Sequence, residues 1–230
     1  MSTNIGSTST NETRSEMSAR VRPGVIPSQA AAKISFAAST ASLVFLFALH
    51  ILSPEFDPSW RMVSEYALGN YGWVLTWMFL TWALSCVALF LAIRSQVQTL
   101  AGKIGLGFLL LSAVGITMGG VFDLNHNLHG LAAMIGMPSL PFAAILISLG
   151  LIRHPAWAAV RRLLLWTAIL TWMSLLLMNI AVFSAFSQSS EQLSQGAWVG
   201  WANRFLIVAY HAWLMSVARQ AVNVPQSPAA

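Results

Sequence analysis

The sequence contains very few charged residues and a single cysteine. Charged side chains make up 8% of its 230 residues, whereas a soluble domain carries about a quarter. This shortage excludes an ordinary water-soluble domain. The lone Cys86 excludes an internal disulfide and a zinc site built from cysteine pairs. The basic residues form no stripe interleaved with aromatics, so we expect no nucleic-acid partner.

Apolar residues make up 57% of the chain, and they gather in long runs. Five stretches without a formal charge hold 19 to 29 residues each, and about 20 apolar residues in a helix cross a bilayer. A sixth stretch is interrupted by Arg204, which lies close enough to one end to reach the membrane surface. No run alternates with period 2, as strands of a membrane barrel would. The sequence therefore predicts an all-α, polytopic membrane protein with six transmembrane helices in one bundle, at about residues 34–54, 70–93, 104–122, 130–152, 163–186 and 198–218.

The two ends of the chain differ from this transmembrane domain, which we assign to residues 33–220. Nine of the first eighteen residues are Ser or Thr, and such a segment buries too little apolar surface to fold. We therefore expect a disordered tail over residues 1–32 and a second one over residues 221–230.

The basic residues predict how the bundle is oriented, because cytoplasmic segments are enriched in Lys and Arg. Six spans place ten of the twelve basic residues on the side of the termini and five of the seven acids on the other. These acids are Glu55, Asp57, Glu65, Asp123 and Glu191. We expect both termini in the cytoplasm and the protein in the cell (inner) membrane.

Two features of the expected helices bear on packing. Gly115 and Gly119 form a GxxxG motif, which permits close helix approach and offers a face for homo-oligomer formation. Pro138 and Pro141 lie inside the fourth span, where each removes a backbone N–H. We expect a kink there, either packed within the bundle or opened as in the broken helices of transporters.

Polar residues gather at one predicted depth near the outer surface. Arg204 should lie roughly 9 Å below the outer end of its helix, where an arginine needs a partner or water. We expect it to pair with Glu65 or Asp123, either to hold the last helix to an outer loop or as part of a functional site. His211 shares the helix face of Arg204, about 10 Å deeper. We expect ligand contacts from Arg204, His211, Ser64 and His50.

The same region suggests two kinds of chemistry. Asp123, His126 and His129 form a D-x-x-H-x-x-H motif whose side chains suit a divalent metal ion, to which His50, Glu65 or His211 could add ligands. Alternatively, Glu65, Asp123 and His129 act as acid and base without a metal. No nucleophile elbow or Ser-His-Asp order is present, so we interpret Ser64 as a loop cap.

The run from Asp57 to Trp73, DPSWRMVSEYALGNYGW, follows the first span. It resembles membrane proteins of bacteria and archaea known as domain-of-unknown-function family 998. In that family a Ser-Glu motif lies in the first outer loop, an acid follows the third span, and His-Gly opens the fourth. The residues that match these features, with the basic residue and tryptophan of the last helix, are Ser64, Glu65, Asp123, His129, Gly130, Arg204 and Trp213.

The resemblance covers roughly residues 34–220, and His126 matches no position of the pattern. It implies the six-span topology and a shared polar site, and it implies no particular activity.

Three classes of function agree with the sequence. The first is an outward-facing site that binds or acts on a lipid or other hydrophobic small molecule; if it is an enzyme, we expect a hydrolase or transferase. The second is a small transporter or permease that uses the proline pair and Arg204. The third is an accessory structural subunit without catalysis. Apart from membrane lipids, the sequence specifies no partner.

Overall fold

The computed structural model describes residues 28–188 and 198–224. Residues 1–27 of the expected tail over residues 1–32, residues 225–230 of the expected tail over residues 221–230, and the segment with Glu191 lie outside the described residues. Within the described ranges the chain is helical and has no strand, as predicted.

Six long helices make up the molecule, and all six are long and apolar enough to cross a membrane. They are α2 (Ser28–Leu52), α3 (Gly72–Ile93), α4 (Leu100–Val121), α5 (His129–Leu151), α6 (Arg161–Gln188) and α7 (Val199–Asn223). Two short 3-10 helices, η1 (Val63–Leu68) and η2 (Pro155–Val160), lie in the connections. The predicted span count is confirmed. Helix α2 begins at Ser28, before the expected end of the tail at residue 32.

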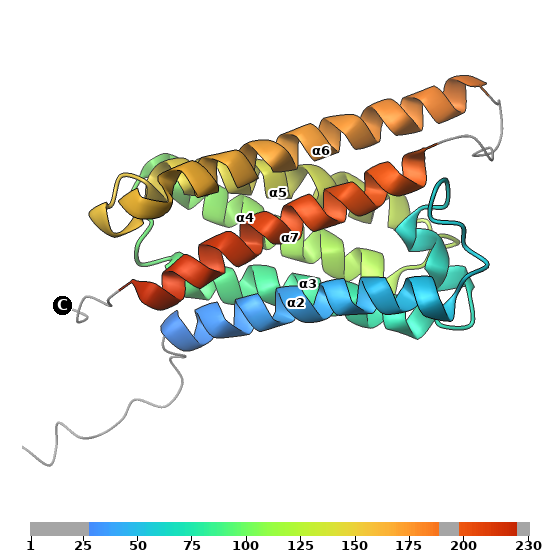
Figure 1. Ribbon diagram of the computed structural model, residues 1–230, viewed down its shortest axis with the longest axis horizontal. Coiled ribbons are helices and arrows are strands. Elements are labelled where there is room, and N and C mark those ends of the chain that lie inside the picture. Colours follow the sequence, from blue (N-terminus) through green and yellow to red (C-terminus); the bar gives the residue numbers. More distant parts are fainter. Residues whose placement is uncertain (1–27, 189–197, 225–230) are drawn as a thin grey trace, which may run out of the picture.

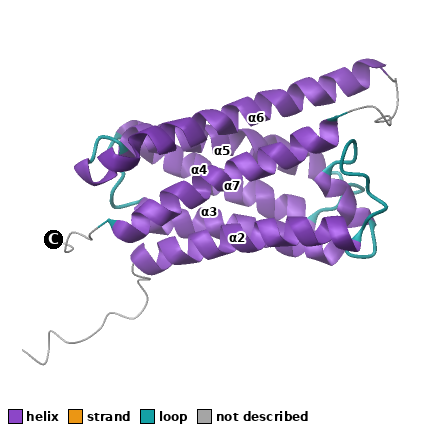
Figure 2. Ribbon diagram, viewed as in Figure 1, coloured by secondary structure: helices purple, strands orange, loops and turns teal. Residues whose placement is uncertain are grey.

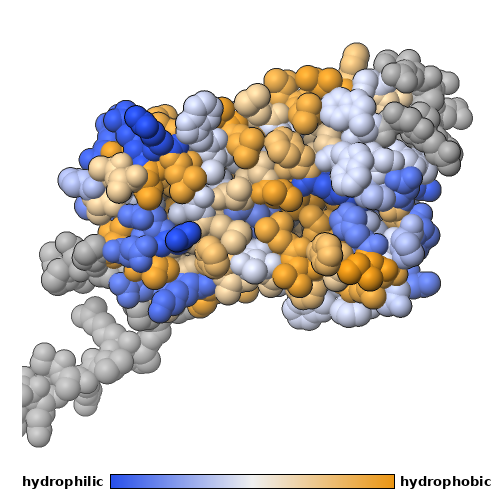
Figure 3. All heavy atoms as spheres, in the orientation of Figure 1, coloured by the Kyte–Doolittle hydropathy of each residue, from blue (hydrophilic) through white to orange (hydrophobic). Residues whose placement is uncertain are grey.

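The helices run along the long axis of the bundle, and each packs against its neighbours in the chain (Figure 1). Helix α7 closes the bundle by packing against α2 and also contacts α3 and α5. Figure 2 shows the loops confined to the two ends of the bundle. On the face drawn in Figure 3, apolar residues cover most of the middle and hydrophilic residues gather toward both ends. This distribution suits a bilayer, because the hydrocarbon core of a bilayer is apolar and its two surfaces are polar.

Small residues bring neighbouring helices close together. A Cβ added to Gly115 would meet the Gly136 backbone nitrogen of α5 at 2.4 Å, so α4 and α5 touch through their backbones. The buried hydroxyls of Ser39 and Ser85 hydrogen-bond at 2.7 Å between α2 and α3. Gly115 of the GxxxG motif therefore packs within the chain.

The two prolines leave α5 as one continuous helix from His129 to Leu151. Pro141 has no N–H for the carbonyl of Met137, four residues earlier. The hydroxyl of Tyr210 on α7 donates to that Met137 oxygen at 2.7 Å. A side chain of the bundle thus satisfies the carbonyl that the proline frees.

Candidate functional site

Arg204 of α7 is a buried charged residue at the end of the bundle where η1 lies, which we call the η1 end. Only 5% of Arg204 is exposed. Its Nε donates to His50 Nε2 at 2.7 Å and one terminal nitrogen to the hydroxyl of Tyr66 at 3.0 Å. The other terminal nitrogen donates to the carbonyls of Arg61 and Gly200, at 2.8 and 3.0 Å. Four of the five N–H groups of a guanidinium therefore have protein acceptors.

These bonds fix the tautomer of His50 in the structure. Arginine only donates, so His50 Nε2 accepts and carries no hydrogen. His50 Nδ1 lies 2.7 Å from the carbonyl of Leu46, which only accepts, so Nδ1 carries the hydrogen. The ring is a neutral acceptor that joins α2 to Arg204.

The expected ion pair of Arg204 with Glu65 or Asp123 is wrong. Among the described residues, the one ion pair joins Glu65 to Arg61, with 2.5 Å between Arg61 Nη1 and Glu65 Oε2. The other oxygen of Glu65 accepts from the backbone N–H of Met62 at 2.7 Å. Neutral acceptors satisfy the guanidinium instead, while Glu65 fixes the start of η1.

The loop before η1 is held against the first turns of α7. The N–H of Gly200 donates to the carbonyl of Ser59 at 3.0 Å. A Cβ at Gly200 would meet the carbonyl oxygen of Pro58 at 2.5 Å, so the close approach requires glycine. In the same loop, hydrogen bonds from the hydroxyl and then the N–H of Ser59 hold the pKa of Asp57 below its usual value.

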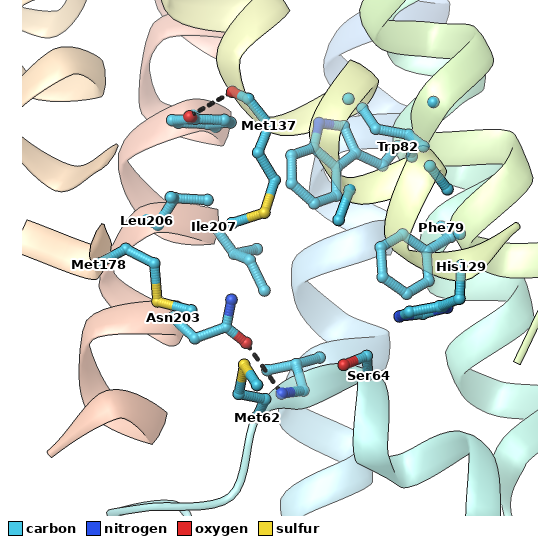
Figure 4. Close-up of a pocket in the computed structure, with 18 of the residues that line it drawn as sticks. Met62, Ser64, Phe79, Trp82, His129, Met137, Met178, Asn203, Leu206 and Ile207 are labelled. Atoms are coloured by element: carbon cyan, nitrogen blue, oxygen red, sulfur yellow. Dashed lines mark hydrogen bonds between the residues drawn. The ribbon is translucent and has the colours of Figure 1, made fainter. Parts of the chain in front are cut away.

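A cavity of about 220 Å³ lies inside the bundle, between the η1 end and the middle of the helices. Its lining comes from η1, from the loop residue Leu124, and from α3, α4, α5, α6 and α7. Nearly all of the lining is apolar, including Phe79, Trp82, Ile116, Met137, Met178, Leu206 and Ile207 (Figure 4). The polar lining side chains are Ser64, His129, Asn203 and Tyr210, and the hydroxyl of Tyr210 is already bonded to Met137.

Three of these polar side chains lie at the η1 end of the cavity. Figure 4 shows Ser64 and His129 at that end, with Asn203 across the cavity from His129. The amide oxygen of Asn203 accepts from the N–H of Val63 at 2.8 Å, and its nitrogen points into the cavity. An apolar cavity with a few polar groups at one end is typical of binding sites for hydrophobic molecules.

The sequence placed more residues in one site than the structure brings together. Ser64 and His129 line the cavity, whereas Asp123 lines a separate, more polar cavity between α3 and α4. Glu65, Arg204, His50 and His211 are not among the cavity-lining residues. Ser64 is not a helix cap, because η1 begins after Met62.

His211 is fully buried in the middle of α7. Its Nδ1 hydrogen-bonds the carbonyl of Ile207 at 2.8 Å, and its ring lies 4.8 Å from that of Trp82. Its Nε2 finds no hydrogen-bond partner within the described ranges. Trp82, which contacts this ring, lines the cavity, whereas His211 does not.

The proposed metal ligands Asp123, His126 and His129 have separate surroundings. Asp123 accepts from the N–H of Asn125, and His126 stacks on Phe122 and accepts from the N–H of Leu128. In residues 28–188 and 198–224, no three His, Cys, Asp or Glu side chains lie close enough to share a metal ion.

Several lining residues had no signal in the sequence. Phe79 and Trp82 are ordinary members of an apolar helix, and only the packing of the helices shows that they line a cavity. Asn203 carried a signal, since it is a polar residue beside Arg204 in an otherwise apolar span. Gly119 could have been noticed, because it belongs to the GxxxG motif and leaves open space beside α3.

Comparison with known proteins agrees with this architecture. The family model described as "Protein of unknown function (DUF998)" matches residues 36–220, which include all six helices except the first residues of α2 and the last of α7. Neither a curated protein nor a solved structure matches the chain. The chain is a multi-pass membrane protein that belongs to domain-of-unknown-function family 998.

Proposed function

We propose that the protein binds a neutral hydrophobic molecule, such as a lipid, in the cavity of the bundle. The observation that carries this proposal is the apolar cavity with Ser64, His129 and Asn203 at one end. Apolar walls favour a hydrocarbon portion, and the three polar groups can bond a carbonyl or hydroxyl. The bias of basic residues toward the opposite end supports a cell-membrane protein whose η1 end faces outward.

The charges around the cavity support a neutral ligand over an anionic one. Arg204 uses four N–H groups within the protein, and Arg61 is paired with Glu65. An anionic head group would therefore have to replace bonds that already exist.

Binding from one side is better supported than transport. Helix α5 is continuous through its prolines, and the buried His211 does not line the cavity. The cavity lining stops near Trp82, Met137 and Tyr210, in the middle of the helices.

The test fills the cavity without disturbing the backbone. Gly119 lines the cavity, and a Cβ there would touch only Phe79, at 3.9 Å. Full-length protein and its Gly119→Leu variant would be purified in detergent, and the co-purified apolar molecules quantified by mass spectrometry. We expect the amount of bound molecule to fall roughly tenfold in the variant, because the leucine side chain occupies the space that the molecule needs.

Gly107→Leu is the matched control. Gly107 lies on the same helix, is exposed, and has no atom within 4 Å of an added Cβ. It should retain the bound molecule. Equal amounts in the wild type and both variants, or none in any of them, would contradict the proposal.

A further inference from the structure

The three polar groups at the η1 end of the cavity differ in chemical character. Ser64 supplies a hydroxyl, His129 an imidazole and Asn203 an amide nitrogen, and they come from η1, α5 and α7. All three side chains are partly buried. A nucleophile, a base and a hydrogen-bond donor that border one apolar space can support acyl transfer.

His129 is oriented to act as a base. Its Nδ1 lies 2.8 Å from the carbonyl of Phe122, which only accepts, so Nδ1 donates in this bond. In the neutral ring the lone pair is then on Nε2, at the other side of the imidazole. A histidine whose orientation is fixed in this way by a third group suits the activation of a hydroxyl.

Asn203 is oriented to act as a donor. Its oxygen must be the atom that accepts from the N–H of Val63, so its nitrogen is the atom directed into the cavity (Figure 4). Side-chain amides placed in this way stabilise the oxyanion that forms during acyl transfer.

Ser64 has a free hydroxyl. The described part of the chain offers its Oγ no hydrogen bond, and the charged neighbour Glu65 is held by Arg61 and Met62. Hydrogen bonds within catalytic groups often form only when a substrate is bound. The hydroxyl therefore stays available at the end of the apolar cavity.

We propose that Ser64, His129 and Asn203 cleave a neutral ester of an apolar carboxylic acid, a reaction that rests on the binding function proposed above. Ser64 Oγ bonds to the carbonyl carbon while its proton passes to His129 Nε2, and the carbonyl oxygen gains negative charge beside the Asn203 amide. The ester C–O bond then breaks, and the departing alcohol takes the proton from His129. Water attacks the Ser64 acyl ester, again through His129, and releases the acid with the serine restored.

The experiment measures covalent labelling of the full-length protein in detergent by an alkyl fluorophosphonate, which reacts with activated serines. We expect the label on Ser64, identified by peptide mass spectrometry, and no label in Ser64→Ala. His129→Gln should slow labelling by roughly 10²-fold or more, the size of a general-base contribution. Asn203→Asp keeps the acceptor for Val63 and removes the donor, and should slow hydrolysis of a long-chain nitrophenyl ester by roughly 10²-fold or more.

His126→Gln is the control, since His126 is exposed and does not line the cavity; it should label and hydrolyse like the wild type. Co-purification of the apolar molecule with Ser64→Ala and His129→Gln shows that the variants fold and that binding persists. If Ser64 of the wild-type protein is not labelled although the protein retains its bound molecule, the catalytic proposal is overturned and the binding proposal is not. Labelling of His129→Gln at the wild-type rate would also overturn the catalytic proposal.

Discussion

Arg204 stabilises the η1 end through bonds to neutral groups. The Arg204→Met variant leaves His50 Nε2, the Tyr66 hydroxyl and the Arg61 carbonyl without this donor. One unsatisfied buried group costs about 1–3 kcal/mol, so we expect a loss of at least ~3 kcal/mol in the free energy of unfolding. Denaturant titration in mixed micelles would measure it.

Arg61→Gln provides the comparison for Arg204. It removes a partly exposed ion pair with Glu65, spaced four residues apart in the chain, and such pairs contribute about 0–1 kcal/mol. If both substitutions lowered the free energy of unfolding equally, the special position assigned to Arg204 would be wrong.

Asp57 gives the η1 end a dependence on pH. Its pKa lies below the ordinary 3.8 in the folded protein, mainly because the Ser59 hydroxyl donates to it. A lowered carboxyl pKa stabilises the fold above the unfolded pKa, and this contribution disappears as the pH falls through the folded pKa. We expect wild-type protein to have a higher Tm than Asp57→Asn at pH 6 and the difference to vanish in strong acid. A difference that stays constant over this range would contradict the assignment.

At the scale of the helices, backbone contact between α4 and α5 sets the shape of the cavity wall. Gly115→Ala would drive a Cβ into the backbone of Gly136, and overpacking costs about 1–3 kcal/mol. We expect a lower Tm by thermal denaturation in detergent. Gly107→Ala, on the exposed side of the same helix, should leave Tm unchanged or raise it slightly, because Ala favours a helix more than Gly does. An equal drop for both variants would contradict a specific contact between Gly115 and Gly136.

The helices themselves were predictable, because the length of an apolar run decides whether it can span a bilayer. All six spans appear, with ends that differ from the expected ones by a few residues. The effect of Pro138 and Pro141 was harder to foresee. Whether a freed carbonyl opens the helix depends on a donor such as Tyr210, which belongs to a different helix.

The candidate site was only partly predictable. Ser64 and His129 line one cavity, and Arg204 lies at the same end of the bundle, where it contacts His50 and Tyr66. The sequence could not show which side chains reach the cavity, so it joined Asp123, which lies in a loop, and Glu65, which pairs with Arg61, to a site that they do not line. The partners of Arg204 are two carbonyls, a tyrosine hydroxyl and a neutral histidine, and no sequence pattern marks a backbone carbonyl as an acceptor.

At the scale of the whole molecule, the proposed functions require that a hydrocarbon chain enters the interior of the bundle and does not only contact its outer surface. The methionines distinguish these two surfaces. Met137 and Met178 line the cavity, whereas Met134 and Met173 are 76% and 61% exposed on the outside of the same helices.

The most direct measurement is photo-crosslinking of the full-length protein in vesicles with a long-chain ester that carries a diazirine, followed by peptide mass spectrometry. Binding inside the bundle predicts crosslinks at the cavity residues Met137 and Met178, reduced by excess unlabelled ester and by Gly119→Leu. Crosslinks confined to outward-facing positions such as Met134 and Met173, unaffected by competitor, would contradict it.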